Sequence, residues 1–168
     1  MPPRTILLYP HAVLKEVCRP VAAMDPDAAA LITDLLDTMR AGPGSVGVAA
    51  PQIGVTLRVC VVDVSASKHG RDNNHGLLVM VNPEIIRREG ASVMREGCMS
   101  VPDYTGDVER AVQITVRFLD GNGEPREIEA NGFEAVAIQH EMDHLDGILF
   151  LDRITSLKTG LFRRKKYK

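Results

Sequence analysis

Two histidines one helical turn apart are the residues of this chain best suited to chemistry. They are His140 and His144, in the stretch QHEMDHLDG at 139–147. An α-helix has 3.6 residues per turn, so both imidazoles lie on one face and can bind the same metal ion. Glu141, beside the first histidine, is placed to handle the protons of a metal-bound water. The stretch therefore predicts a hydrolytic metal site.

The residues around the histidines indicate that this helix faces inward. The positions of one helical face are Phe133, Val136, Ala137, His140, Glu141, His144 and Leu145. Inward-facing imidazoles need polar partners, and one bound metal satisfies both of them. The simpler alternative is a helix with two solvated histidines, which a pattern as short as H-E-x-x-H does not exclude.

A third ligand is needed, because a catalytic metal usually takes three protein ligands and keeps one position for water. Cys98 is the strongest candidate, since Gly97 lets the backbone approach closely and the polar neighbours are unlike those of a core cysteine. A thiolate is a strong metal ligand. On sequence context alone, a buried free cysteine is favoured over a ligand at this position, because that is the usual role of a lone cysteine. The remaining histidines are expected to be solvated, namely His11, His69 and His75.

The elements that position these residues are an N-terminal helix, a series of strands and the histidine helix. Asp25 and Pro26 predict the start of the first helix, and Gly42 predicts its end. Strands are expected at Arg58–Val64, Leu77–Val81, Glu84–Arg88, Ala91–Arg95, Val112–Phe118 and Arg126–Ala130. This order predicts an α+β fold in which mostly antiparallel sheets wrap around one central metal-binding helix.

Turn and cap residues predict where these elements begin and end. Glu89-Gly90 is expected to turn one hairpin, and Asp120–Gly123 a second. Asn131 and Glu134 have the spacing of a capping box at the start of the histidine helix, which Gly147 closes. These predictions concern local structure, so the structure tests them directly.

The end of the chain is expected to hold a last short strand, Ile148–Leu151, and a basic tail, Arg163–Lys168. No linker or repeat divides the 168 residues, so the chain is expected to be a single catalytic domain, 1–168. Residues 153–168 form its C-terminal segment. The tail is expected to be a solvated end, with a contact to ribosomal RNA as the alternative.

Composition excludes several classes of function. A formal net charge of −2 gives no general attraction to nucleic acid, so no DNA partner is expected. No apolar run reaches the roughly 18 residues of a membrane span, and the short apolar run after residues 1–4 is not expected to act as a signal peptide. The three cysteines show no paired spacing, which is typical of a reducing compartment. We therefore expect a cytoplasmic protein without a membrane partner.

Three motifs together resemble those of the peptide deformylase family, in that family's order and spacing. They are VGVAAPQ at 46–52, EGCMS at 96–100 and QHEMDH at 139–144. The resemblance spans nearly the whole chain, and the three motifs together are very specific. It implies a metal-dependent hydrolase that removes the formyl group from the N-terminal formylmethionine of newly synthesised proteins and releases formate. Its partners would be nascent formyl-Met polypeptides.

The resemblance also implies which residues hold the metal and which act on the substrate. Cys98, His140 and His144 would hold one divalent metal ion per chain. A sulfur and two nitrogens suit several metals. The resemblance suggests Fe(II) in the cell, with Zn, Ni or Co in purified protein.

A metal-bound hydroxide would attack the formyl carbon, with Glu141 as general acid and base. By the same resemblance, the side chain of Gln52 and the backbone N–H of Met99 would stabilise the oxyanion. Without the resemblance, the sequence context of Gln52 would favour an ordinary loop residue with no catalytic role.

A pocket for the methionine side chain is expected beside the histidine helix. It is expected between the helix residues Phe133, Val136, Ala137 and His140 and the two residues Val46 and Glu96. Gly47 and Gly97 complete the predicted substrate-binding residues. The helix residues among them are equally suited to plain core packing. The substrate backbone is expected to add as a strand along Val46-Gly47. The resemblance further implies that Arg110 pairs with Glu96. The chain departs from the family pattern at Ser45, where the family usually has glycine.

Two other classes of protein fit parts of this pattern. A zinc peptidase of the H-E-x-x-H kind would need a third histidine or glutamate as ligand after His144, and none follows. A binding protein with a structural metal would need a fourth protein ligand, and it gives Glu141 no role.

Overall fold

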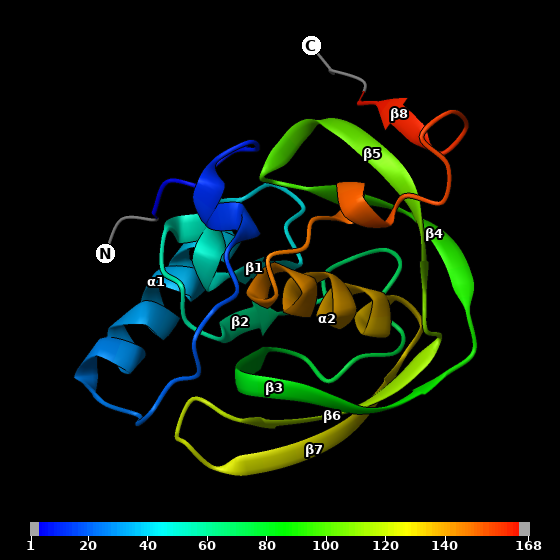
Figure 1. Ribbon diagram of the computed structural model, residues 1–168. Helices are drawn as coiled ribbons and strands as arrows, with labels where there is room; N and C mark the ends of the chain where they lie inside the picture. The colour runs from blue at the N-terminus through cyan, green and yellow to red at the C-terminus, as the bar shows by residue number, and fades with distance from the viewer. Residues whose placement is uncertain (1–3, 165–168) are drawn as a thin grey trace.

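The computed structural model describes residues 4–164, and Figure 1 shows its arrangement. Its 3-10 helices are η1 (Ala12–Lys15), η2 (Ala50–Ile53) and η3 (Phe150–Arg153), and its α-helices are α1 (Pro26–Ala41) and α2 (Gly132–Leu145). The strands are β1 (Gly47–Ala49), β2 (Val59–Val62), β3 (Leu78–Glu89), β4 (Ser92–Cys98), β5 (Val101–Arg110), β6 (Gln113–Leu119), β7 (Pro125–Asn131) and β8 (Leu161–Arg163).

Two antiparallel sheets surround the second helix. The five-stranded sheet has the order β1-β2-β3-β6-β7, and the three-stranded sheet has the order β4-β5-β8. Figure 1 shows α2 in the middle, with the strands curving around it. The expected α+β fold of antiparallel sheets around a central helix is therefore confirmed.

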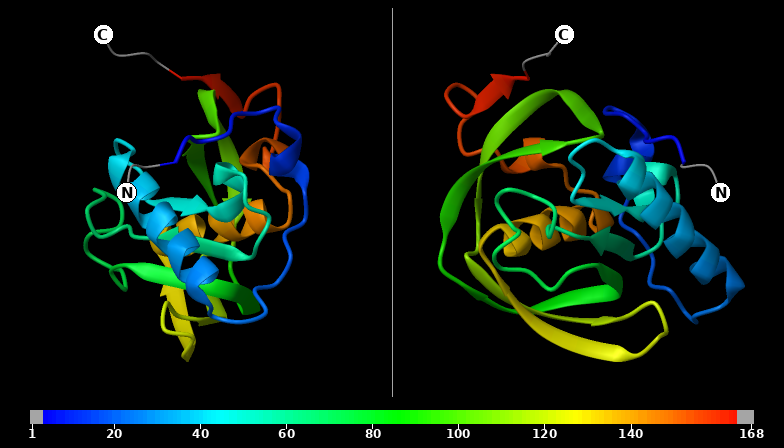
Figure 2. Two further views of the ribbon diagram at one scale, coloured as in Figure 1. Left: turned by 90° about the vertical axis from the view of Figure 1, so that its left-hand side faces the viewer. Right: turned by 180° about the vertical axis from the view of Figure 1, so that it is seen from behind.

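The strand β2 separates the two helices, which explains its unbroken run of apolar residues. Side chains alternate along a strand, so Val59 and Val61 face α1 while Cys60 and Val62 face α2. All four are fully buried. Figure 2 shows α1 against the outside of β1 and β2. A strand covered on both faces has no position for a polar side chain.

The central helix α2 is buried over almost its whole length. Every residue from Glu134 to Leu145 is buried, including both histidines. A helix enclosed on all sides cannot have one polar and one apolar face. Among residues 4–164, no helix is long and apolar enough to cross a membrane.

The predicted ends of α1 are confirmed. The side chain of Asp25 accepts a hydrogen bond from the N–H of Ala28 at 2.9 Å, and Pro26 occupies the first turn. Gly42 follows the last helical residue, and its N–H donates to the carbonyl of Met39. The second expected hairpin is also confirmed, because Asp120–Gly123 joins the paired strands β6 and β7.

The hairpin expected at Glu89-Gly90 is wrong. Gly90, at φ +71°, carries the chain from β3 in the five-stranded sheet to β4 in the three-stranded sheet. Glu84–Arg88 is also no separate strand, because it continues β3 beyond an irregularity at Asn82. Asn82 bonds the backbone N–H and carbonyl of Val21, which stabilises this irregularity. A local turn signal does not reveal which sheet the next strand joins.

The capping box expected at the start of α2 is also wrong. Asn131 is the N-cap, but its side chain bonds Asn73 and makes no cap hydrogen bond. Glu134 accepts a hydrogen bond from the N–H of His75 at 2.7 Å, and its carboxylate also contacts the His75 ring. His75 is therefore not a solvated histidine, as expected from sequence, but ties the preceding loop to the buried start of α2.

The last strand lies later in the chain than expected. Residues 148–151 form no strand, since a 3-10 helix begins at Phe150, and β8 at Leu161–Arg163 is the final one. Of the basic tail, Arg163 and Arg164 lie within the described part of the chain, and residues 165–168 lie outside it. The tail is thus partly structural, because Arg163 belongs to a paired strand.

We predict that Gly147→Ala lowers the stability of the fold. Gly147 has φ +74°, and a Cβ there would lie 2.5 Å from the carbonyl oxygen of Lys15. Alanine is strained in the left-handed backbone conformation, and its Cβ would also overpack against Lys15. Together these effects should lower the free energy of unfolding by ~3 kcal/mol, which corresponds to ~6–12 °C in Tm. Thermal unfolding followed by circular dichroism measures it.

Gly132→Ala is the matched control. Gly132 has φ +60°, but a Cβ there meets nothing within 4 Å. It therefore carries the backbone strain alone and should cost ~1 kcal/mol. Equal losses for the two variants would show that the contact with Lys15 contributes nothing.

Candidate metal centre and active site

Three potential metal ligands from distant parts of the chain meet beside α2. Cys98 ends β4, while His140 and His144 lie one turn apart on α2. Their ligand atoms all lie within 4.8 Å of one another, and Cys98 Sγ is 3.4 Å from His144 Nε2. Two ligands of a tetrahedral ion, at bond lengths of about 2.3 and 2.0 Å, would lie about 3.5 Å apart. The structure brings together the three residues that the sequence singled out.

The free atoms of this cluster fit a divalent metal. Nδ1 of His140 bonds Glu96 Oε1 at 2.8 Å, which leaves Nε2 to face the other two ligands. Burial, followed by the charge of His140, holds the pKa of His144 well below its usual value, which favours the neutral ring that a ligand needs. For His140, burial is outweighed by the hydrogen bonds with Cys98 and Glu96, which raise the pKa, so a bound metal would displace a proton from this ring. A thiol and two imidazoles are a donor set for Zn, Fe(II) or Ni.

A buried ion-pair network holds His140 in place. Arg110, from the end of β5, donates to both carboxylate oxygens of Glu96 at 2.8 and 2.9 Å, as the resemblance implied. The same guanidinium also bonds Asp143, which in turn pairs with Arg153. Burial opposes the charge of Glu96, but the hydrogen bonds from Arg110 and His140 outweigh it and lower its pKa to about 2. A fixed carboxylate thereby orients the His140 ring.

Glu141 lies in the cavity with an unpaired oxygen. Its Oε1 is buried and has no hydrogen-bond partner in residues 4–164. The backbone of Gly47 packs against it, since a Cβ on Gly47 would lie 2.8 Å from Oε2. Burial raises the pKa of Glu141 to about 7, although the neighbouring His140 charge opposes the rise. A carboxyl group with this pKa can both accept and give up a proton near neutral pH.

The amide of Gln52 is fixed from both ends. Its Oε1 accepts from the N–H of Ala49 at 2.9 Å, and its Nε2 donates to Ser100 Oγ at 3.1 Å and to Cys98 Sγ at 3.5 Å. The NH₂ group is therefore directed at Cys98, one of the three potential metal ligands. Met99 lies in the turn between β4 and β5, next to the same cysteine.

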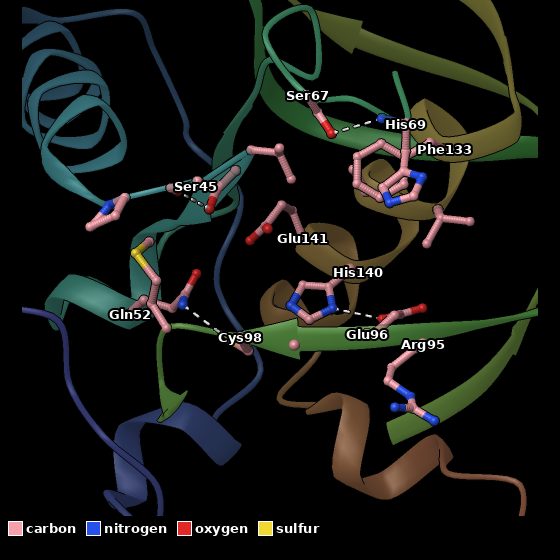
Figure 3. A pocket seen from close by; sticks show the side chains of 18 of the residues that line it. Ser45, Gln52, Ser67, His69, Arg95, Glu96, Cys98, Phe133, His140 and Glu141 are labelled. Carbon is pink, nitrogen blue, oxygen red and sulfur yellow. Dashed lines mark hydrogen bonds and ion pairs between the residues drawn. The ribbon is translucent and has the colours of Figure 1, made fainter. Parts of the chain in front are cut away.

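One cavity of about 390 Å³, which we call the site cavity, is lined by Gln52, Cys98, Met99, His140 and Glu141. Figure 3 shows Gln52, His140 and Glu141 around it. Its lining includes all seven residues predicted to bind substrate, namely Val46, Gly47, Glu96, Gly97, Phe133, Val136 and Ala137. Ser45 also lines it and donates a weak hydrogen bond to the Gly47 carbonyl at 3.4 Å. Their role with substrate stays a prediction.

Several residues of the site could not be found from the sequence. His69, expected to be solvated, lines the site cavity, with its ring 5.6 Å from that of Phe133. Arg95 and Arg164 also line the cavity, and Ser100 holds Gln52. Only the fold brings these loops and strand ends together. Ser100 belongs to the EGCMS motif, but its contact with Gln52 is not evident from that motif, and no local motif marks His69, Arg95 or Arg164.

Comparison with known proteins gives one consistent family. The family model for polypeptide deformylase matches residues 3–160. The chain is 48% identical over 160 residues to a peptide deformylase of Alkalilimnicola ehrlichii, covering 95% of this chain and 86% of the relative. It is 45% identical over 157 residues to one of Thermodesulfovibrio yellowstonii, covering 94% and 92%.

Crystal structures give the same result. The peptide deformylase of Legionella pneumophila superposes with a TM-score of 0.82 at 42% identity, covering 93% of this chain and 88% of that chain. The peptide deformylase of Synechococcus elongatus, in complex with actinonin, gives a TM-score of 0.84 at 34% identity, covering 94% and 82%.

We predict that Glu96→Gln weakens metal binding. The amide keeps the shape of the side chain but removes the charge that orients His140 and pairs with Arg110. Loss of such an outer partner typically costs 10- to 100-fold in metal affinity, which we take as the expected size here. Competition with a chelating dye for Zn²⁺ measures it.

Glu109→Gln makes the same chemical change on an exposed position of β5 and should leave the affinity unchanged. An unaltered Zn²⁺ affinity in the Glu96 variant would contradict the orienting role.

Proposed function

The chain belongs to the polypeptide deformylase family, whose members are metal-dependent hydrolases that remove the formyl group from N-terminal methionine, and we propose that Cys98, His140 and His144 hold its metal. The observation that supports this most strongly is their convergence beside the unpaired carboxylate of Glu141. Membership of the family excludes the peptidase and the structural-metal alternatives.

The buried carboxylate of Glu141 is the group that moves protons. The metal, when bound, would supply a Lewis acid and a water of lowered pKa. Glu141 accepts a proton from the attacking water and then passes it to the nitrogen of methionine, which leaves as an amine. The pKa of about 7 suits both transfers, because neither the charged nor the neutral form is strongly favoured. Formate is the other product.

Two donors stabilise the negative charge that develops on the formyl oxygen. They are the NH₂ group of Gln52 and the backbone N–H of Met99. The Gln52 side chain is already held, because its Oε1 accepts from the N–H of Ala49 and its NH₂ group donates to Ser100. Because Gln52 is fixed before substrate binds, little reorganisation is needed during the reaction. Removing one such donor costs roughly 10²–10³ in rate in other enzymes.

The substrate enters as an extended peptide. The methionine side chain lies against the α2 face formed by Phe133, Val136 and Ala137, and the peptide backbone pairs along Val46-Gly47. Backbone pairing reads no side chains, so it accepts nascent chains of many sequences. We place the reaction in the cytoplasm, in a single catalytic domain of the whole chain.

Fe(II) is the metal we propose for the cell, with Zn, Ni or Co able to replace it in purified protein. The thiol ligand suits a reducing compartment, since oxidation of Cys98 would remove one of the three donors. We also keep the basic end of the chain as a candidate contact with the ribosome. Arg163 and Arg164 are the two members of this end within the described residues.

We predict that Glu141→Gln strongly slows formate release from formyl-Met-Ala-Ser. The amide cannot accept the proton, so kcat should fall by ~10²–10⁴ while the protein still holds one metal ion. Formate is measured with a coupled dehydrogenase assay, and the metal by elemental analysis of the same sample.

Cys98→Ser should instead lose both the metal and the activity, whereas Glu129→Gln, on an exposed site of β7, should keep both. Full activity in either Glu141→Gln or Cys98→Ser would refute the role proposed for that residue.

A further inference from the structure

Arg164 directly follows the C-terminal strand β8, and its side chain reaches the site cavity. β8 pairs with β5, and the Arg164 N–H continues this pairing by donating to the Asp103 carbonyl at 2.8 Å. Figure 1 shows β8 alongside β5, at the edge of the smaller sheet. The Arg164 side chain lines the site cavity together with Gly97. A residue near the end of the chain is thus placed beside the metal-ligating segment.

The guanidinium occupies the space beside the α-carbon of Gly97. A Cβ built on Gly97 would collide with Nη2 of Arg164, and it would lie 3.4 Å from Thr105 Cγ2. Gly97 directly precedes Cys98, so this contact lies one residue from a proposed metal ligand. The absence of a side chain at position 97 lets Arg164 approach the cavity wall this closely.

The charges around the cavity leave Arg164 without a carboxylate. Glu96 is matched by Arg110 and His140, and Glu141 is buried beside the metal ligands. Arg95, which Figure 3 shows beside Glu96, pairs with Asp107 at 3.6 Å and stacks over the ring of Phe162 at 3.5 Å.

For the Arg164 guanidinium, residues 4–164 provide no ion pair and no side-chain hydrogen bond. The Arg164 guanidinium is therefore available to pair with an anionic group of a ligand in the site cavity.

We propose that Arg164 selects substrates that carry a carboxylate close to the formylmethionine. This inference rests on the proposed function, because it takes the site cavity as the place where the peptide lies. An extended peptide advances ~3.3 Å per residue, so the second and third residues lie within ~7 Å of the methionine, along the cavity wall. A guanidinium binds a carboxylate through two parallel hydrogen bonds. The ligand is thus an Asp or Glu side chain at the second or third residue of the nascent protein.

The test compares kcat/KM for formylated tripeptide amides at low salt. Formyl-Met-Asp-Ser and formyl-Met-Ala-Asp are compared with the same peptides carrying Lys, and formyl-Met-Ala-Ser is the neutral reference. The C-terminal amide ensures that only a side chain supplies the carboxylate. For a partly exposed pair, the Asp peptide of the recognised position should be preferred over its Lys counterpart by about fivefold, and 0.5 M salt should weaken this preference.

Arg164→Gln should reduce the Asp/Lys ratio to about one, while Arg164→Lys, which keeps the charge, should retain part of it. Arg163→Gln is the matched control, because it removes the same charge one residue earlier, outside the lining of the site cavity. This control should keep the wild-type ratio. Circular dichroism of each variant verifies that it is folded.

Three results would overturn the assignment. They are equal rates for Asp and Lys peptides in the wild type, an unchanged ratio in Arg164→Gln, or an equal loss of the ratio in Arg163→Gln. A preference seen only with free C-terminal acids would refute the choice of a side-chain carboxylate. Absence of formate from every peptide, the neutral reference included, would instead refute the proposed function itself.

Discussion

The burial of a helix rich in ionisable residues is the constraint on which this structure depends. A charged or polar group removed from water costs several kcal/mol unless another group pairs with it. The buried polar residues of α2 are Glu134, Gln139, His140, Glu141, Asp143 and His144. Four are satisfied from other elements: Glu134 by His75, Gln139 by the backbone of Ala111, His140 by Glu96, and Asp143 by Arg110 and Arg153. The buried atoms left without partners in residues 4–164 belong to Glu141 and His144, the residues to which we assign the chemistry.

The two sheets enclose this helix with different kinds of side chain. The larger sheet contributes an apolar wall, in which β2 separates the cores around α1 and α2. The smaller sheet contributes the polar partners, since Glu96 and Cys98 come from β4 and Arg110 from β5. Placing Glu96 two residues before Cys98 on the same strand puts both on one side of it. One strand therefore supplies a proposed metal ligand, Cys98, and the carboxylate of Glu96, which orients a second proposed ligand, His140.

Local sequence patterns predicted the parts of the molecule that depend on local physics. Asp25, Pro26 and Gly42 mark the ends of a helix wherever it packs, and the H-E-x-x-H spacing fixes which side chains share a face. The failures were long-range. Glu89-Gly90 has the composition of a turn, but whether the next strand returns to the same sheet depends on packing elsewhere. Asn131 and Glu134 have capping spacing, yet Asn73 and His75 from a distant loop compete for their side chains. Arg164 is a tail residue by composition and a cavity residue only because β8 pairs with β5.

The convergence of one thiolate and two imidazoles on a single metal with an open position is the central claim. X-ray absorption spectroscopy at the metal edge, on protein purified without oxygen or loaded with Zn²⁺, measures the atoms around the ion directly. The account predicts one sulfur at about 2.3 Å, two imidazole nitrogens at about 2.0 Å and one further light atom from solvent. A coordination shell without sulfur, or one filled by four protein ligands, would contradict it.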